Sequence, residues 1–482
     1  MINKVKVLYF IPNTRWYNKR PWMQVPYTAG ILTHLLKDEF DFNILDTNVL
    51  NLSFQESLDK IISLSPDIFL VSGLSVEYYQ QYHKSFELAK NYNPKIKVVF
   101  GGIYPTLLPE KALEDKNIDY VFMGHAEERI NDFINIISSS DLKEKISHFS
   151  GVGYRGIDGI VINPVKSFIG DIKKIAKPDY SFIDVSKYVS YKSQDVLNNT
   201  SEGSNATILT SFGCPQNCSF CASRTISGKK VLYRPMEDVL EEIDMYIHEY
   251  GVRNITFTDE NLLAKRDRAE ALLTHFINSK YDLKWQLANV ALWHLDDSLL
   301  ELMKKSGCTA ISPSIESGSK RVLRDIIRKP IKIHDKVPGV VAKCKELEIN
   351  IIAHFVIGMP GETWYEIRET FNYAESFEFD LVVFHIATPY PKTDLYKQCL
   401  EENLLPQDFD FFSDKFYGTS RGFITTDEFT PDELMVLRAY EWDRINFSTP
   451  QKTSLIANMM SMNLDELTQH RKNTRLKCGV HY

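Results

Sequence analysis

The chain has 482 residues, of which 44% are hydrophobic and 25% are charged, and its formal net charge at pH 7 is −7. This composition is typical of a globular protein, and the length predicts two or three domains. The negative charge disfavours nucleic acid as the main partner. The apolar start Val5–Ile11 is shorter than a signal-peptide core, and no apolar run approaches the roughly 20 residues of a membrane span, so we expect a cytoplasmic protein.

Residues 1–140 alternate short apolar runs with amphipathic stretches such as Val76–Tyr92 and Glu127–Ile137. This alternation predicts a parallel, doubly wound (Rossmann-like) α/β domain, which binds ligands beyond the carboxyl ends of its strands. The expected strands are Val5–Ile11, Phe42–Asp46, Asp67–Gly73, Ile96–Gly101 and Tyr120–Gly124.

Glycines and small polar residues follow three of these strands. The residues are Ser72, Gly73, Gly101, Gly102, Thr106 and Gly124. Glycine at a strand end either forms a tight turn or lets a bulky ligand approach the backbone. No GxGxxG phosphate-binding motif occurs in this domain, which disfavours a dinucleotide as the ligand.

Residues 141–205 are rich in turn residues and are expected to form a connector, with a hairpin in Gly151–Gly159. Residues 206–400 contain six further strand and helix repeats, which predict a partial (β/α)6 barrel of the TIM type with its functional groups at the carboxyl ends of the strands. The expected strands are Thr207–Ser211, Asn254–Thr258, Leu283–Ala288, Thr309–Ile315, Ile351–Ile357 and Leu381–Ile386.

The ends of three helices can be predicted from their capping residues. Pro235 is expected at the first position of a helix that stops at Gly251, and Asp296 is expected to cap a helix that ends at Gly307. Residues 401–482 predict a helical C-terminal cap, in which Thr430 and Pro431 open an amphipathic helix.

The strongest motif is the triplet Cys214, Cys218 and Cys221, with the spacing C-x3-C-x2-C. Three thiolates leave one iron of a four-iron cluster without a protein ligand, and that iron can bind a small molecule. A zinc site would need a further Cys or His pair nearby, and the nearest downstream histidine is the isolated His248. Three unrelated buried thiols are the remaining alternative.

Carboxylates and glycines lie at the ends of three barrel strands, in Asp259–Asn261, Ile315–Ser319 and Val356–Glu362. Glu316 can accept hydrogen bonds from a ribose or an amine, and Gly358 and Gly361 allow the backbone to approach a base. The alternative for Asp259 and Glu316 is the capping of a helix.

The triplet, with Phe220 in the penultimate position, resembles the signature of the radical S-adenosylmethionine (SAM) superfamily. The resemblance implies a [4Fe-4S] cluster bound by the three cysteines, and SAM bound to the open iron. It also implies SAM contacts from Phe220, Asp259, Glu316, Ser317 and Gly358. The hardest chemical step then belongs to the cofactors, and no side chain is assigned as catalytic.

The segments Gly101–Thr106 and Asp119–Glu127 resemble the cobalamin-binding domain that precedes the radical domain in one class of these enzymes. The resemblance implies cobalamin contacts from Ser72, Gly73, Gly101, Gly102, Thr106 and Gly124. The motif that supplies a histidine to cobalt in other cobalamin proteins is absent, so we expect base-off cobalamin without an axial histidine.

The function implied is methyl transfer to an unactivated carbon of a small molecule or a peptide, with an external electron donor such as flavodoxin or ferredoxin. One alternative with the same cofactors is cyclisation or another oxidative rearrangement, and one from another class is a non-catalytic cobalamin or iron–sulfur binding protein. Relatives often have an arginine after the third barrel strand, where this chain reads Ala288–His294. The segment Thr388–Thr393 also departs from the family pattern, because it contains a lysine. Both segments face the expected substrate cavity, so the identity of the substrate stays open. His354, His385 and Tyr390 contact the substrate or are packed in the barrel.

Overall fold

The computed structural model describes residues 4–139, 142–166, 177–191, 204–412 and 421–477. The chain forms two compact units, Met1–Val189 with Ile226–Gly228, and Ser190–Thr225 with Lys229–Tyr482. In the described parts of the chain, no helix is long and apolar enough to cross a membrane.

The first unit is an α/β domain. Its elements are β1 (Lys6–Ile11), η1 (Trp16–Asn18), α1 (Tyr27–Leu36), β2 (Asp41–Asp46), α2 (Phe54–Leu64), β3 (Ile68–Gly73), η2 (Val76–Tyr78), α3 (Tyr79–Tyr92), β4 (Lys97–Gly102), α4 (Ile103–Leu107), α5 (Pro109–Leu113), β5 (Tyr120–Phe122), α6 (Ile130–Ser138), α7 (Leu142–Ser147), β6 (Val152–Gly156), β7 (Gly159–Asn163) and α8 (Val185–Val189).

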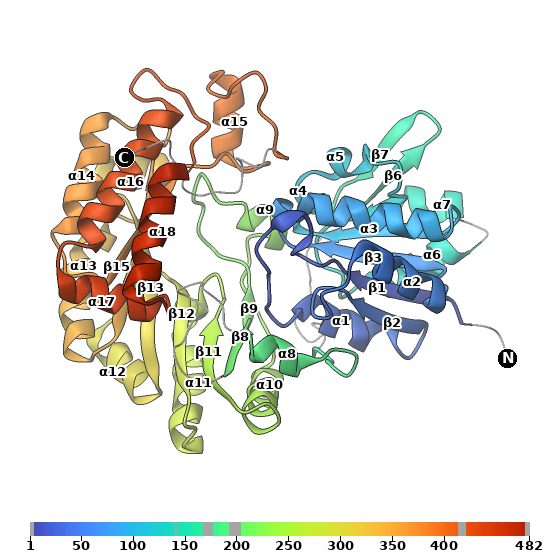
Figure 1. The fold of residues 1–482 in the computed structure, drawn as a ribbon, viewed down its shortest axis with the longest axis horizontal. Helices are drawn as coiled ribbons and strands as arrows, with labels where there is room; N and C mark the ends of the chain where they lie inside the picture. The colour runs from blue at the N-terminus through green and yellow to red at the C-terminus, as the bar shows by residue number, and fades with distance from the viewer. Residues whose placement is uncertain (1–3, 140–141, 167–176, 192–203, 413–420, 478–482) are drawn as a thin grey trace. The chain divides into compact units, whose positions relative to one another are not determined.

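These strands form one seven-stranded sheet in the order β2-β1-β3-β4-β5-β6-β7 (Figure 1). Strands β1 to β5 are parallel, as the alternating pattern predicts. Strand β1 pairs with β2 on one side and with β3 on the other, so the order changes direction at β1. The hairpin expected in the connector is present as β6 and β7, and β6 pairs antiparallel with β5. The sheet therefore has seven strands instead of the five predicted from the sequence.

The second unit contains the cysteine triplet. Its elements are β8 (Ser204–Ile208), β9 (Ser211–Phe212), α9 (Ser223–Ser227), β10 (Leu232–Tyr233), α10 (Met236–His248), β11 (Val252–Phe257), η4 (Leu262–Ala264), α11 (Arg266–Ser279), β12 (Lys284–Val290), η5 (Leu292–His294), α12 (Asp297–Lys305), β13 (Cys308–Glu316), η6 (Val322–Ile327, a π-helix), α13 (Lys332–Glu346), β14 (Asn350–Ile357), α14 (Trp364–Glu375), β15 (Leu381–Ile386), α15 (Asp394–Glu401), α16 (Pro431–Asn446), α17 (Pro450–Met459) and α18 (Leu464–Lys477).

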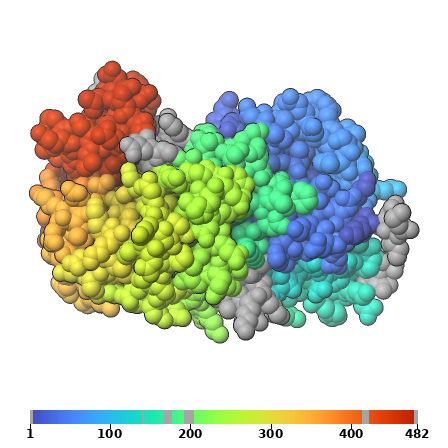
Figure 2. Space-filling model, turned by 90° about the horizontal axis from the view of Figure 1, so that it is seen from below, coloured from blue at the N-terminus to red at the C-terminus, as the bar shows by residue number. Residues whose placement is uncertain are grey.

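Six parallel strands in the order β15-β14-β13-β12-β11-β8 form the sheet of this unit. Helices α11 to α14 lie outside the strands in Figure 1, and Figure 2 shows the packed outer surface of α10 to α12 in yellow-green and yellow. The predicted partial barrel is thus confirmed, and its carboxyl edge is where functional groups are expected.

The first barrel strand differs from its prediction. Thr207–Ser211 was expected as one strand, but β8 stops at Ile208 and β9 begins at Ser211. The reason is that the Thr210 amide donates to the carboxylate of Asp259 (3.1 Å) instead of continuing the strand ladder. Pairing of β9 with β10 then directs the chain toward the cysteines.

Helix boundaries follow their capping chemistry. Asp296 accepts from the Leu299 amide and caps α12, and Thr430 forms a capping box with Glu433 at the start of α16. The prediction for Pro235 is wrong by one position, because its backbone is extended (ψ 136°) and it is the cap before α10. The buried face of that helix contains Val239, Ile243, Tyr246 and Ile247.

Candidate functional site

The three cysteines lie on a short loop between β9 and α9, entered through Gly213 with φ +85°. Ser219, in the middle of the loop, forms hydrogen bonds through its amide, its hydroxyl and its carbonyl. Its amide donates to Ile327 O (3.2 Å), its hydroxyl donates to Ile326 O (2.8 Å), and its carbonyl accepts from the Leu395 amide (2.9 Å). The loop is therefore fixed against η6 and α15 of its own unit.

The three thiols lie close enough to one another for their charges to interact in all three pairs. Cys221 is the most exposed of them. Burial raises the pKa of every thiol, and that of Cys218 to about 12, so metal binding by these residues would displace their protons.

This arrangement suits a cluster better than a single ion. The described residues contain no group of three His, Cys, Asp or Glu side chains placed to hold one metal ion. In a four-iron cluster each cysteine binds a different iron, whereas zinc ligands converge on one ion at about 2.0–2.3 Å.

Asp259, expected to contact SAM, is fully buried and its carboxylate is occupied. It accepts from the Thr210 amide and hydroxyl (2.8 Å for the hydroxyl) and from the Ser211 hydroxyl (2.5 Å). Those two residues lead directly into the cysteine loop. The carboxylate therefore positions that loop, and a direct SAM contact from Asp259 stays a prediction.

The next two residues along the chain were not singled out from the sequence as site residues. Glu260 Oε2 and both side-chain polar atoms of Asn261 are buried without a hydrogen-bond partner in the structure. The Glu260 charge also acts on Cys214 and Cys221. Buried polar atoms are nearly always paired, so these atoms indicate a place for a polar ligand beside the cysteines. The available sequence signal was the run of two carboxylates and one carboxamide in Asp259–Asn261.

A cavity of about 340 Å³ lies inside the barrel of the second unit. It is lined by Phe220, Ala288, Asn289, Ser314, Glu316, His354, Val356, His385, Ile386, Ala387, Thr388 and Tyr390. The cavity thus brings together two of the predicted SAM residues, Phe220 and Glu316, with the three residues proposed to contact substrate. Asp259, Ser317 and Gly358 are not among its lining residues.

Glu316 is directed by an irregularity in its strand. Ser314 lies opposite His354 on β14 and Glu316 lies opposite Phe355, so two residues of β13 face one residue of β14. Glu316 itself has φ +73°, which is rare for a residue other than glycine. Bulges and such backbone strain often occur at functional sites, where they aim a side chain.

Ser317 and Gly358 face neighbouring helices instead. The Ser317 hydroxyl is bonded to that of Thr370 on α14 (3.1 Å). The Gly358 amide donates to Glu362 Oε2 (2.7 Å), and a side-chain carbon at Gly358 would lie 2.5 Å from Leu434 of α16. Their SAM contacts stay predictions, and in the structure both residues hold the loops that surround the cavity.

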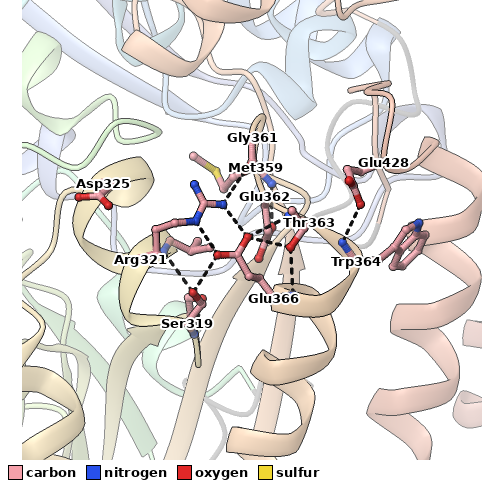
Figure 3. A network of polar contacts seen from close by, with 12 residues as sticks. Ser319, Arg321, Asp325, Met359, Gly361, Glu362, Thr363, Trp364, Glu366 and Glu428 are labelled. Carbon is pink, nitrogen blue, oxygen red and sulfur yellow. Dashed lines mark hydrogen bonds and ion pairs between the residues drawn. The ribbon is translucent and has the colours of Figure 1, made fainter.

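Figure 3 shows the polar network around these loops. Arg321 donates to both oxygens of Glu366 (2.7 and 2.6 Å) and to Gly361 O (2.7 Å). Glu366 also caps α14 through Thr363 and accepts from the Ser319 hydroxyl (3.1 Å). Glu362 is buried, which raises its pKa to about 8. The loops after β13 and β14 are thereby tied together.

The predicted cobalamin residues lie together at the carboxyl edge of the first unit's sheet. Ser72 and Gly73 of β3 pair with Gly101 and Gly102 of β4. The Thr106 hydroxyl donates to Gly102 O (2.7 Å) and accepts from the Gly124 amide (2.9 Å), which joins the loops after β4 and β5.

Only some of these glycines are required by packing. A side-chain carbon on Gly102 would lie 2.7 Å from Gly73 O, and one on Gly73 would lie 2.8 Å from the Phe100 ring. At Gly101 and Gly124 the nearest atoms would lie at 3.7 and 3.6 Å. A side-chain carbon at these two positions would make ordinary van der Waals contacts, and cobalamin contact stays a prediction.

Two family models match the chain. The model of the radical SAM superfamily matches residues 208–374, and that of the B12-binding domain matches residues 25–134. The chain therefore carries a radical SAM domain and a B12-binding domain. The cofactors of this class are a [4Fe-4S] cluster, SAM and cobalamin.

Curated relatives cover most of the chain. An uncharacterized methyltransferase of Pyrococcus horikoshii is 28% identical over 83% of this chain and 84% of its own length. Cytidylyl-2-hydroxyethylphosphonate methyltransferase of Streptomyces wedmorensis is 26% identical over 79% of this chain and 76% of its own. Anaerobic magnesium-protoporphyrin IX monomethyl ester cyclase of Rubrivivax gelatinosus is 25% identical over 78% and 65%.

A solved structure shares the fold. It is the radical SAM methyltransferase TsrM of Kitasatospora setae with cobalamin and a [4Fe-4S] cluster bound, and it superposes with a TM-score of 0.69. The superposition covers 83% of this chain and 78% of that one at 18% sequence identity.

Proposed function

We propose that the chain is a cobalamin-dependent radical SAM methyltransferase that acts on an unactivated carbon of a small molecule or a peptide. The observation that carries the proposal is the loop of three mutually close cysteines beside a cavity lined by Phe220 and Glu316, in a chain with a B12-binding domain. The names of the relatives in Pyrococcus horikoshii and Streptomyces wedmorensis support methyl transfer.

Each part of the site has a distinct task in this proposal. Cys214, Cys218 and Cys221 would hold the cluster, and the unpartnered atoms of Glu260 and Asn261 would bind polar groups of SAM. When bound, the cofactors supply a methyl group and a radical that removes hydrogen from carbon. The apolar walls of the cavity, such as Phe220 and Val356, would exclude water from that radical.

We also infer an external one-electron donor such as flavodoxin or ferredoxin.

The six described cysteines are free thiols, and none of the three outside the triplet is exposed. A reducing compartment suits both free thiols and an oxygen-sensitive cluster, so we propose a cytoplasmic location.

The test is anaerobic reconstitution with iron, sulfide and cobalamin, followed by reaction with methyl-labelled SAM and a low-molecular-weight extract of the source cells. Label in a product together with 5′-deoxyadenosine supports methyl transfer. Deoxyadenosine without label in any product supports the cyclase or rearrangement alternative, for which the Rubrivivax gelatinosus relative is a precedent.

Single alanine variants of Cys214, Cys218 and Cys221 test the cluster itself. Each should abolish SAM cleavage and leave cobalamin bound, because the cobalamin residues lie in the other compact unit. Intact cleavage in any of the three variants would refute the cluster assignment. Absence of cleavage by the unaltered protein under a strong reductant would favour a binding protein without catalysis.

A further inference from the structure

Lys329 is a buried cation beside the cysteine loop, and nothing in the proposed function uses it. Its side chain is 10% exposed. Its ammonium group donates to Glu316 Oε1 at 2.5 Å and to Ser314 O at 3.3 Å. A buried lysine is rare unless it is paired, and here the pair with Glu316 lies where the cavity approaches the cysteines.

The backbone holds Lys329 and the cysteine loop in one fixed relationship. Helix η6 ends at Ile327, Arg328 has φ +68°, and the Lys329 amide donates back to Leu323 O (2.8 Å). The carbonyls of Ile326 and Ile327, at the end of the same helix, accept from Ser219 between Cys218 and Phe220. These bonds fix the backbone of Lys329 relative to the cysteine loop, and the bonds to Glu316 and Ser314 hold its ammonium group.

The charge of Lys329 acts on all three thiols and opposes the rise in their pKa. Burial by itself disfavours the charged form of Lys329, but the Glu316 carboxylate bonded to it at 2.5 Å favours that form, and the pKa of Lys329 is raised. The charge of Glu316 raises the pKa of Cys218, whereas the charge of Lys329 lowers it. A buried cation and a buried anion that are bonded to each other therefore act on the cysteines with opposite signs.

We propose that Lys329 is a positioning residue that raises the reduction potential of the cluster, and that Glu316 opposes it. The inference rests on the proposed function, since it requires a cluster on the three cysteines. The cluster accepts one electron from an external one-electron reductant and later passes it to the SAM sulfonium. Reduction adds one negative charge, which a nearby cation stabilises, and burial keeps water and salt from screening that interaction.

The test measures the potential of the reconstituted cluster in the absence of SAM and substrate, by redox titration followed by electron paramagnetic resonance. Lys329→Met should lower the potential by at least the 59 mV that corresponds to a tenfold change in a one-electron equilibrium. Lys329→Arg keeps the charge and should stay near the unaltered protein. Glu316→Gln should shift the potential in the opposite direction, and Lys329→Met/Glu316→Gln should fall between the two single variants.

Lys320→Met is the matched control, because Lys320 is an exposed lysine that precedes the same helix. Its charge is screened by water, so its loss should leave the potential unchanged. The opposite signs expected for Lys329→Met and Glu316→Gln separate an electrostatic role from a structural one. Disruption of the fold would lower iron content or shift both variants in the same direction.

The inference is overturned if Lys329→Met has the potential of the unaltered protein, or if both variants shift alike. If Lys329→Met fails to load four irons, the potentials of Glu316→Gln and Lys329→Arg decide. A higher potential in Glu316→Gln with an unchanged potential in Lys329→Arg supports the inference. An unchanged potential in Glu316→Gln overturns it. If the unaltered protein forms no reducible cluster, the proposed function itself fails.

Discussion

His354 Nδ1 lies 2.9 Å from His385 Nε2, and the two imidazole rings are nearly parallel, with 6° between their planes. The pair spans adjacent strands. His385 on β15 lies opposite Val356 on β14, and His354 precedes Val356 by two residues, so both rings are on the same face of the sheet. Both histidines line the barrel cavity, and His354 Nε2 is buried without a hydrogen-bond partner in the structure.

Because the pair is buried, stability should depend on pH through it. Burial lowers the pKa of His354 to about 4 and that of His385 to about 3. Above the ordinary value of about 6.5 both rings are neutral in the folded and the unfolded chain, and the pair has no effect. As the pH falls below that value only the unfolded chain gains protons, which at pH 5 destabilises the fold by about 2 kcal/mol for one histidine.

Thermal melting at pH 7.5 and pH 5 of the unaltered protein and of His354→Gln/His385→Gln measures this contribution. The unaltered protein should lose more of its melting temperature on acidification than the variant does. His248, at the end of α10 on the outside of the barrel, gives the control His248→Gln, which should keep the pH dependence of the unaltered protein. An equal loss in the unaltered protein and the double variant would contradict the prediction.

Asp259→Ala should weaken the cysteine loop and its binding of iron. The change leaves the Thr210 amide, the Thr210 hydroxyl and the Ser211 hydroxyl without their acceptor. Loss of a buried acceptor of this kind destabilises by about 2–4 kcal/mol. Iron bound per chain after reconstitution should fall, and Asp259→Asn, which keeps one acceptor oxygen, should lose less. Full iron loading in Asp259→Ala would contradict this role.

Glu260→Gln and Ser317→Ala should have opposite effects on affinity and stability. Glu260 Oε2 has no partner, so removal of its charge breaks no bond at that atom but should weaken SAM binding at least tenfold, or by about 1.4 kcal/mol. The Ser317 hydroxyl is bonded to Thr370 and to the Ser319 amide, so its loss should lower the melting temperature and leave SAM affinity nearly unchanged. Calorimetric titration of the cluster-loaded variants with SAM measures the affinities. Weaker SAM binding by Ser317→Ala, with unchanged binding by Glu260→Gln, would show that Ser317 rather than Glu260 contacts SAM.

The sequence predicts the elements of this fold well because apolar runs and caps are local signals. Strand β15 has the bounds expected from Leu381–Ile386, and Asp296 caps its helix as predicted. The direction of side chains beyond a strand end is not local. Asp259 and Glu260 are neighbours after β11, yet the first is bonded to the chain and the second is not. The alternation of strand faces has ended there, so no periodicity distinguishes them.

Contacts between residues far apart in sequence explain the other differences. Ser317 resembles a ligand-binding serine, but Thr370, on the helix after the next strand, occupies its hydroxyl. Lys329 carries no motif that points to the cysteines, and its position follows from the ending of η6 against Ser219. Such pairings depend on the packing of the barrel.

Gly358 and Gly361 allow backbone strain to be separated from steric overlap, because both have φ +81°. An alanine at Gly358 would place its side-chain carbon 2.5 Å from Leu434 Cδ1, whereas at Gly361 the nearest atom, on Ile326, would lie at 3.7 Å. Both alanine variants should lose about 1 kcal/mol from the left-handed backbone, and Gly358→Ala should lose a further 1–3 kcal/mol from overpacking. Gly358→Ala/Leu434→Ala should be less destabilised than the sum of its single variants, since the truncated leucine makes room. Unfolding in urea, followed by circular dichroism, measures these differences. Equal losses in the two glycine variants would show that the packing of α16 on this loop does not limit the position.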